Sequence, residues 1–266
     1  MTHRPLTASL RAMSPFASAL KTWRKTRRYS QLDLAHQAEV SARHVAFLET
    51  GKANPSREMI GKLSDALDLP LSARNELFTS AGFAVRYTAR DWTDDEMAPI
   101  RAAVDFLLRR HAPYPAFALD HHWHIAALNE PAERLFGPLG ITRGASMIDV
   151  IKGGAIRTAI ENWSDVCHFT YRRLRTESLA RGGDPCLDAA AAEIGENDFG
   201  PPSASGPVVP ITLAIADQRL SLFSTITQFG TPEDLTLDDL RIEHFFPADE
   251  PTRNWFEGQV ATNTDE

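Results

Sequence analysis

The sequence contains little cysteine and no long apolar run. Cys167 and Cys186 are the only two cysteines among 266 residues, too few for a disulfide framework, so free buried thiols are expected. No stretch approaches the length of a transmembrane helix. The first residues, MTHRPLTASLRAMSPF, lack the apolar core of a signal peptide. These absences predict a cytoplasmic protein that does not insert into a membrane.

Motifs of common enzyme classes are also missing: there is no G-x-S-x-G, no HExxH and no strand-flanked phosphate loop. The run 120–124, DHHWH, has the composition of a metal cluster. Strand alternation would put only His122 and His124 on one face, however, and no further ligands stand at a recognisable spacing. A structural turn is the favoured interpretation, and a metal-dependent enzyme at His122 and His124 is a remote alternative. We therefore expect no catalytic residue, no metal site and no enzymatic activity.

Charge is divided unevenly along the chain. Residues 1–90 hold 14 of the 28 Lys and Arg but 7 of the 35 Asp and Glu, a balance of +7. The remainder holds 14 basic and 28 acidic residues, a balance of −14. This asymmetry predicts a nucleic-acid-binding module joined to a part that does not bind nucleic acid. Lys21, Arg24, Lys25, Arg27 and Arg28 form a basic run where a phosphate backbone would pass.

The stretch 30–55, SQLDLAHQAEVSARHVAFLETGKANP, predicts two short helices joined by a tight turn at Glu39-Val40. Ser30 and Ser41 are good N-caps, and Asp33 stands in a capping-box position. The expected inward residues are Leu32, Leu34, Ala35 and Ala38 in the first helix and Val45 and Leu48 in the second. The second helix keeps a small, basic outer face made of Ala42, Arg43, His44, Ala46 and Phe47. Such a face suits base edges in the major groove of DNA, although an ordinary pair of packed helices is the alternative.

These residues resemble the Cro/C1-type (XRE family) helix-turn-helix, and the run from His44 to Ala84 resembles the MmyB-like transcription regulators. The resemblance implies base contacts by Ala42, Arg43 and Phe47. It implies phosphate contacts, which set register rather than sequence choice, by Gln31, His44, Thr50, Lys52, Asn54 and Arg57. One departure is Glu39, at a turn position that is usually glycine. A left-handed backbone there would cost roughly 1 kcal/mol.

The length of the chain allows two domains. The first is an all-α five-helix helix-turn-helix domain at 15–82, with a disordered tail at 1–14 before it and a linker at 83–92 after it. The residues 93–96, TDDE, have the pattern of a capping box that opens a helix running to His111. This helix could lie along a dimer axis or on its own domain.

The second domain, at 93–250, is expected to be α+β, and a tail follows at 251–266. Two short strands around a turn at Asp120-His121 precede helices expected at 130–136, 147–151, 164–181 and 184–194. The strands VVPITLAIA, RLSLFSTITQF and 240–246 follow. This order predicts an antiparallel sheet covered by helices on one side. The layout and fragments such as HAPYPAFALDHHWHIAALN and EHFFPADE resemble the PAS-like, ligand-binding half of the MmyB-like regulators.

The resemblance implies that this half binds a small apolar ligand such as a fatty acid. Pockets of this kind are mostly apolar with a few polar anchors. The candidate lining residues, each of which could instead be simple core, are Phe117, Leu119, Trp123, Trp163, Phe169, Phe223 and Phe229. Pockets of the PAS type can also host haem or flavin, but no specific ligand residue argues for either.

These features together predict a transcription regulator that binds double-stranded DNA as a homodimer and senses a small ligand through its second domain. The alternative is a DNA-binding regulator that is controlled by a protein partner, in which case the second domain would have a filled core.

Overall fold

The computed structural model describes residues 14–195, 206–215 and 217–263. The chain passes from one compact unit to a second between Tyr87 and Thr88. The tail expected at 1–14 lies outside the described residues except for Ser14, which caps the first helix. No described helix is long and apolar enough to cross a membrane.

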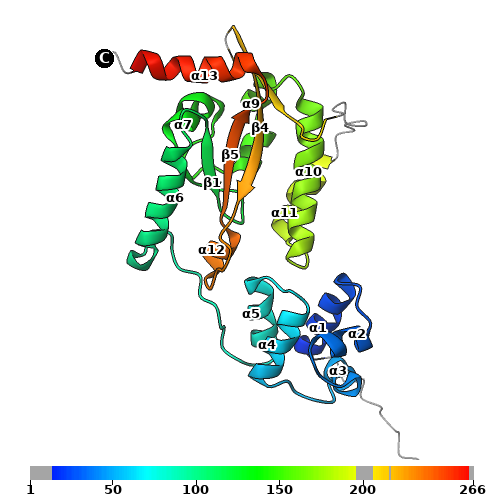
Figure 1. Ribbon diagram of the computed structural model, residues 1–266. Coiled ribbons are helices and arrows are strands. Elements are labelled where there is room, and N and C mark those ends of the chain that lie inside the picture. The colour runs from blue at the N-terminus through cyan, green and yellow to red at the C-terminus, as the bar shows by residue number, and fades with distance from the viewer. Residues whose placement is uncertain (1–13, 196–205, 216, 264–266) are drawn as a thin grey trace, which may run out of the picture. The chain divides into compact units, whose positions relative to one another are not determined.

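The first unit consists of the five expected helices (Figure 1), which are α1 Pro15–Thr26, α2 Gln31–Gln37, α3 Ala42–Glu49, α4 Arg57–Ala66 and α5 Leu71–Ser80. Ser30 and Ser41 cap α2 and α3 as predicted, and Ser30 forms the full capping box with Asp33. Glu39 has a φ of 55° in the turn between these helices. The turn therefore keeps its left-handed backbone without a glycine.

The core of the first unit includes Leu34 and Ala35 from α2 and Val45 and Leu48 from α3. Leu32 was also expected inside, but its side chain is 69% exposed. Two residues correspond to roughly 200° around an α-helix, so Leu32 lies almost opposite Leu34. The prediction for Leu32 is wrong because α2 buries only one narrow face.

A buried ion pair joins three helices of the first unit. Glu49, at the end of α3, is 3% exposed. Its carboxylate accepts hydrogen bonds from Arg24 Nε and Nη2 at 2.6 and 2.9 Å and from Gln31 Nε2 at 2.7 Å. Burial acts to raise the pKa of Glu49, but the hydrogen bonds from Arg24 and Gln31 outweigh it and lower the pKa.

Two arginines of the basic run therefore have structural roles rather than the expected phosphate-facing one. Arg24 is engaged by Glu49. Arg27 donates to the carbonyl oxygens of Leu67 and Asp68 at 2.8 and 2.6 Å. Both side chains tie α1 to later parts of the same unit.

The linker expected at 83–92 is held at both ends. The amide oxygen of Asn75 accepts from the backbone N–H groups of residues 86 and 87, and its nitrogen donates to the Tyr87 carbonyl at 2.7 Å. Beyond this point, Thr88 Oγ1 donates to Asp234 at 3.2 Å and Arg90 pairs with Asp234 at 2.8 Å. Residues 83–87 of the predicted linker thus belong to the first unit, and residues 88–92 belong to the second.

The second unit is built on one antiparallel sheet with the strand order β2-β1-β5-β4-β3. The strands are β1 Ala116–Leu119, β2 Ile125–Leu128, β3 Ile211–Ile215, β4 Gln218–Thr227 and β5 Arg241–Pro247. Ile211 lies opposite Leu222 and Leu213 opposite Leu220, so the apolar faces predicted for β3 and β4 coincide. The α+β fold class is confirmed.

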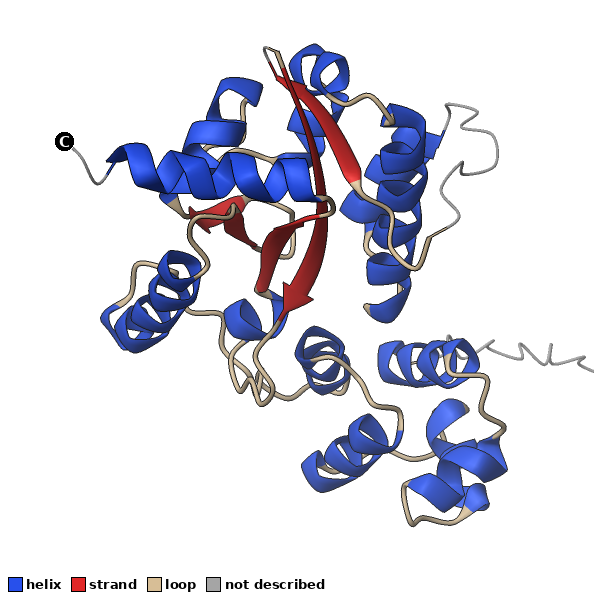
Figure 2. Cartoon of the chain, turned by 45° about the horizontal axis from the view of Figure 1, so that its top comes forward, coloured by secondary structure: helices blue, strands red, loops and turns tan. Residues whose placement is uncertain are grey.

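The helices that share a core with one face of this sheet include α7 Glu130–Phe136, α8 Met147–Lys152, α9 Gly154–Ala159, α10 Trp163–Ala180 and α11 Pro185–Gly195. The short segments η1 Asp95–Met97, η2 Gly137–Leu139 and α12 Leu235–Asp239 complete the connections. Figure 2 shows the helices and strands of this unit from a second direction. Helix α7 has the predicted bounds, whereas α9 and α12 lack a sequence prediction.

The opposite face of the sheet is covered as well, so the prediction of helices on one side only is wrong. Helix α6, Ala98–Arg110, packs Val104 and Leu108 against Ala116, Ala118 and Ile242. The small alanine side chains of β1 leave room for a helix at close range. In Figure 1, α6 and α10 lie on opposite sides of the sheet.

Both ends of the second domain differ from the prediction. The capping box expected at 93–96 does not form, because the Asp91 carboxylate accepts from the Thr93 N–H at 2.8 Å and from its hydroxyl at 2.5 Å, and α6 starts at Ala98. The tail expected at 251–266 is helical as far as Asn263, in α13 Glu250–Asn263, and its last three residues lie outside the described residues. Thr252 Oγ1 accepts from Ser221 N at 2.9 Å, and Phe256 joins the core. These contacts make α13 part of the domain.

The buried pair predicts how the first unit responds to mutation. Glu49→Ala should cost about 3 kcal/mol or more, because Arg24 would be left buried without its partner. The exposed Glu58, which pairs with Lys62, provides the matched control, and Glu58→Ala should cost under about 1 kcal/mol. Chemical denaturation followed by far-UV circular dichroism measures both, and equal costs would contradict the role assigned to Glu49.

The same pair predicts a pH dependence. A carboxyl whose pKa is lower in the folded state stabilises the fold above its unfolded pKa of about 4.3, and this stabilisation is lost as the pH falls through the folded pKa. The wild-type unit should therefore lose more stability on acidification than a Glu49→Gln variant. Thermal unfolding of both proteins across an acid pH series measures the difference, and parallel curves would contradict it.

Candidate functional site

The outward face of α3 presents an aromatic ring between two cations. Arg43 and Lys52 are exposed and Phe47 is half-buried. The Arg43 guanidinium carbon lies 5.1 Å from the centre of the Phe47 ring, and Lys52 Nζ lies 5.9 Å from it. Ala42 packs partly against the core of the first unit. A positive, partly apolar surface of this kind can meet both phosphates and base edges.

The residues expected at phosphates differ in how free their side chains are. Lys52 and Asn54 are exposed beyond α3, and His44 is half-buried. The exposed Thr50 donates its hydroxyl to the Ala46 carbonyl at 2.7 Å, which leaves the oxygen able to accept.

Two of these expected residues have partners inside the first unit. The Gln31 amide donates to Glu49 at 2.7 Å. The Arg57 guanidinium lies over the rings of Phe78 and Phe83, at 5.7 and 5.2 Å. These contacts compete with a phosphate for the same side chains.

The second unit contains a cavity of about 480 Å³ between the inner face of the sheet and α10. Its walls are mainly aliphatic and aromatic, with contributions from α7, α8, α9 and the segment 206–209. From α10 come Trp163, Val166, Phe169, Thr170 and Arg173. A cavity of this size falls in the range of roughly 300–1,000 Å³ that proteins use for small ligands.

Six of the seven expected lining residues lie along this cavity: Phe117, Leu119, Trp123, Trp163, Phe169 and Phe223. The ring of Phe223, however, stacks on the ring of Phe246, with 5.5 Å between the ring centres. Phe245 lines the cavity, and strand alternation places Phe246 on the opposite face of the sheet from Phe245. Phe229 is not at the cavity, since it packs against the cluster beneath α6. The prediction for Phe229 is wrong because the chain beyond β4 passes to the other face of the sheet.

Three polar lining residues that hydrophobic patterns did not find, Arg173, Ser224 and Glu243, contact one another, and we call this group the polar end of the cavity. Arg173 Nη1 donates to Glu243 Oε2 at 2.9 Å, and Ser224 Oγ donates to Glu243 Oε1 at 2.7 Å. Arg173 Nε also donates to Glu177 at 2.9 Å. The position of Arg173 on the same face of α10 as Trp163, Val166 and Phe169 is the sequence signal that could have located it.

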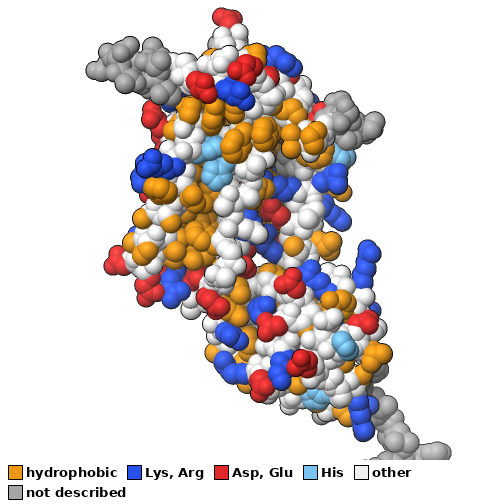
Figure 3. All heavy atoms as spheres, viewed as in Figure 1, with side chains coloured by type: hydrophobic (Ala, Val, Ile, Leu, Met, Phe, Trp, Pro, Cys, Tyr) orange, Lys and Arg blue, Asp and Glu red, His pale blue; other side chains and the backbone are white. Residues whose placement is uncertain are grey.

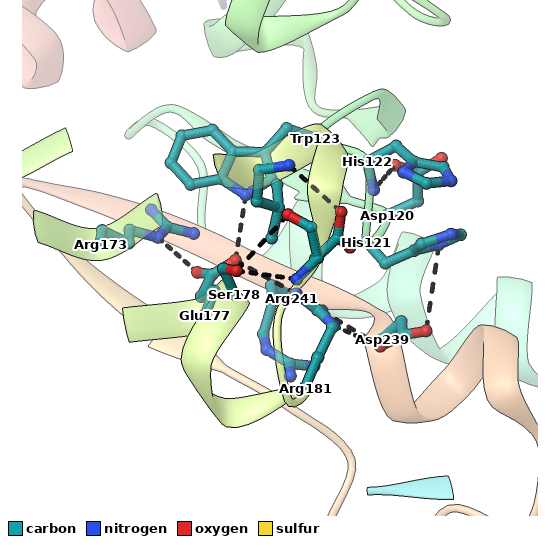
Figure 4. A network of polar contacts seen from close by, with 12 residues as sticks. Asp120, His121, His122, Trp123, Arg173, Glu177, Ser178, Arg181, Asp239 and Arg241 are labelled. Carbon is teal, nitrogen blue, oxygen red and sulfur yellow. Dashed lines mark hydrogen bonds and ion pairs between the residues drawn. The ribbon is translucent and has the colours of Figure 1, made fainter. Parts of the chain in front are cut away.

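Figure 4 shows Arg173 with its partner Glu177 and with Trp123. Its guanidinium carbon lies 4.6 Å from the centre of the Trp123 ring, and Trp123 Nε1 donates to Glu177 at 3.0 Å. Burial acts to lower the pKa of Arg173, but Glu243 and Glu177 outweigh it and raise the pKa. Two carboxylates and the Trp123 ring therefore hold this guanidinium in place.

Two known family descriptions match the chain, one in each unit. The description "MmyB-like transcription regulator ligand binding domain" matches residues 100–257, and "Helix-turn-helix" matches residues 20–73. The chain belongs to the MmyB-like transcription regulators. The expected resemblance is confirmed, and this MmyB-like regulator combines a DNA-binding helix-turn-helix with a domain for a small-molecule ligand. Both families are of the regulator type.

Other comparisons add little to this assignment. None of the curated proteins matches the MmyB-like regulator. One solved structure, "Structure of an RNA-binding Light-Oxygen-Voltage Receptor", is 14% identical, covers 100% of this chain and 70% of its own, and has a TM-score of 0.22. A TM-score this low supports no conclusion about fold or ligand.

The histidine run of the MmyB-like regulator forms a turn. Asp120 Oδ1 accepts from the backbone N–H groups of His122 and His124, both at 2.9 Å. Strand β2 starts only at Ile125, so strand alternation does not arrange these histidines. Among residues 14–195, 206–215 and 217–263, no group of three or more His, Cys, Asp or Glu side chains could hold a metal ion.

Filling the cavity should weaken binding of apolar molecules by this MmyB-like regulator. Val166→Phe places a larger ring in the lining and should raise the dissociation constant of an apolar fluorescent dye by about tenfold. Leu179→Phe, at a 64% exposed position of the same helix, is the control and should leave the dissociation constant unchanged. Equal dye affinity in both variants, measured by fluorescence titration, would argue against the cavity as the binding site.

Proposed function

We propose that this MmyB-like regulator reads DNA with the outward face of α3 and responds to a fatty-acid-like molecule held in the cavity of its second unit. The observation that carries the proposal is the mainly apolar cavity whose two charged lining residues, Arg173 and Glu243, are paired, which suits a molecule with one aliphatic chain and one polar head. A domain that served only as a surface for a protein partner would have no need of such a space. The cavity therefore favours ligand control over partner control.

On the DNA side, α3 lies in the major groove with Ala42, Arg43 and Phe47 toward the base edges. Arginine is suited to guanine, and the apolar parts of Ala42 and Phe47 suit thymine methyl groups. The phosphate contacts come from His44, Thr50, Lys52 and Asn54, with Gln31 and Arg57 contributing where their internal partners allow. The negative charge of DNA supplies most of the affinity through such contacts.

The protein acts as a homodimer, with two α3 helices about one turn of duplex, roughly 34 Å, apart. Support comes from α6, where Phe106 is 52% and Leu107 37% exposed. Figure 3 shows apolar side chains gathered over α6 and the adjoining strands. Ligand binding would favour one arrangement of the two DNA-binding units in the cytoplasm, and a coupling of roughly 1–3 kcal/mol suffices for regulation.

The DNA contacts are tested by selecting bound duplexes from a random pool and then titrating variants on the selected site. Arg43→Ala should relax base preference at one position and cost about 1–3 kcal/mol there. Lys52→Ala should weaken all sequences alike and reduce the salt dependence of binding by about one unit of slope. If both variants bound the selected site like the wild type, the proposed docking of α3 would be wrong.

The ligand is tested by native mass spectrometry of freshly purified protein. The wild type should carry a small molecule of lipid-like mass, and the Val166→Phe variant should carry much less of it because its cavity is partly filled. The Leu179→Phe variant controls for handling. A wild-type protein that never carries such a mass, and binds no aliphatic probe, would favour a protein partner instead.

A further inference from the structure

The charges at the polar end of the cavity balance one another. Arg173 and Glu243 are the two charged residues among the described residues that line the cavity, and they are paired at 2.9 Å. Glu177, just behind them, is the second carboxylate on Arg173. Glu177 also lies 3.9 Å from the guanidinium of Arg181, so two guanidiniums already face two carboxylates before any ligand enters.

Arg173 also cannot turn toward a ligand at low cost. Its Nε and Nη1 atoms are engaged by carboxylates on two different elements, Glu177 on α10 and Glu243 on β5. The ring of Trp123 covers the guanidinium at 4.6 Å and is itself fixed to Glu177. Turning Arg173 away would break its ion pairs with both carboxylates and would leave the buried Glu243 with only the Ser224 hydroxyl as a partner, which is costly.

A charged ligand head fits this site poorly. A carboxylate would bring a third negative charge beside Glu243 and Glu177, whose two charges are already balanced by Arg173 and Arg181. An ammonium would be attracted by Glu243 but repelled by Arg173, and it would lose its hydration in an apolar cavity. An uncharged head loses far less hydration, and the site still offers it hydrogen bonds, with Arg173 as a donor and Glu243 and Ser224 as acceptors.

We infer that the ligand carries an uncharged head that both donates and accepts hydrogen bonds, such as a hydroxyl or a primary amide, and that Glu243 excludes free carboxylates. The inference rests on the proposed function, since it assumes that an aliphatic chain fills the cavity. It names the chemical class of the head within the broader group of fatty-acid-like molecules.

The test compares four probes with the same dodecyl chain: dodecanol, dodecanamide, dodecanoate and dodecylamine. Their affinities for the delipidated full chain are measured by displacement of an apolar dye at about pH 7.5, where the last two are charged. Dodecanol and dodecanamide should bind roughly tenfold or more tightly than dodecanoate and dodecylamine. This comparison needs no variant, so it stands even if a variant fails to fold.

A variant then assigns the selectivity to one residue. Glu243→Gln removes one negative charge and keeps a hydrogen-bonding side chain, so dodecanoate should gain roughly tenfold while dodecanol changes by less than about threefold. Glu250→Gln removes the same charge at an exposed position paired with Arg253, and it should leave all four affinities unchanged. Circular dichroism confirms that both variants fold.

The outcomes separate the two levels of the proposal. If dodecanoate or dodecylamine binds the wild type as tightly as dodecanol, the uncharged head is overturned while an aliphatic ligand stands. If Glu243→Gln folds and leaves the preference unaltered, the role of Glu243 is overturned. If no probe binds and native mass spectrometry finds no small molecule, the proposed function fails and this inference fails with it.

Discussion

The buried carboxylate of Glu49 fixes the surface on which DNA recognition depends. Helix α3 has only eight residues, too few to hold its own orientation through apolar contacts alone. Val45 and Leu48 anchor one side of it, and Glu49 adds hydrogen bonds to α1 and α2. With these residues held inward, the helical repeat turns Arg43 and Phe47 outward. The same short helix thus carries both the buried, hydrogen-bonded Glu49 and the exposed contact face.

A similar arginine–carboxylate pair serves a different purpose in the second unit. Arg173 and Glu243 join α10 to β5 beside a cavity. An unfilled cavity forgoes packing contacts and lowers stability, and a ligand that binds only the folded state restores stability in proportion to its concentration and affinity. The clamp on Arg173 keeps the polar end in place while the apolar part stays open. The cavity thus combines polar residues that are held in place with a mainly apolar wall.

Local sequence signals predicted much of this structure and tertiary constraints account for the remainder. The caps at Ser30 and Ser41, the turn at Glu39 and the bounds of α7 all follow from side chains within a few residues of one another. Leu32 was misplaced because apolar character alone does not say which side of a short helix faces the core. Helix α13 was missed because its place depends on Ser221, which is distant in the sequence.

The candidate sites divide in the same way. The outward residues of α3 follow from helical periodicity, and the cavity residues Phe117 and Leu119 follow from strand alternation on β1. The polar end does not follow, because it joins residues from α10, β4 and β5 that no local pattern connects. Cys186 is likewise exposed rather than buried, since its position on α11 is decided by how that helix packs on α10.

Polar contacts also lead from the cavity to the start of the second unit. Glu177 pairs with Arg173 at 2.9 Å and also lies 3.9 Å from Arg181. Arg181 in turn pairs with Asp239 of α12 at 3.1 Å. Asp234, which caps α12, holds Thr88 and Arg90. A ligand can shift an equilibrium only by the difference in its affinity for the two states. These contacts place Arg173 in one polar network with α12, which in turn holds the residues that follow the DNA-binding unit.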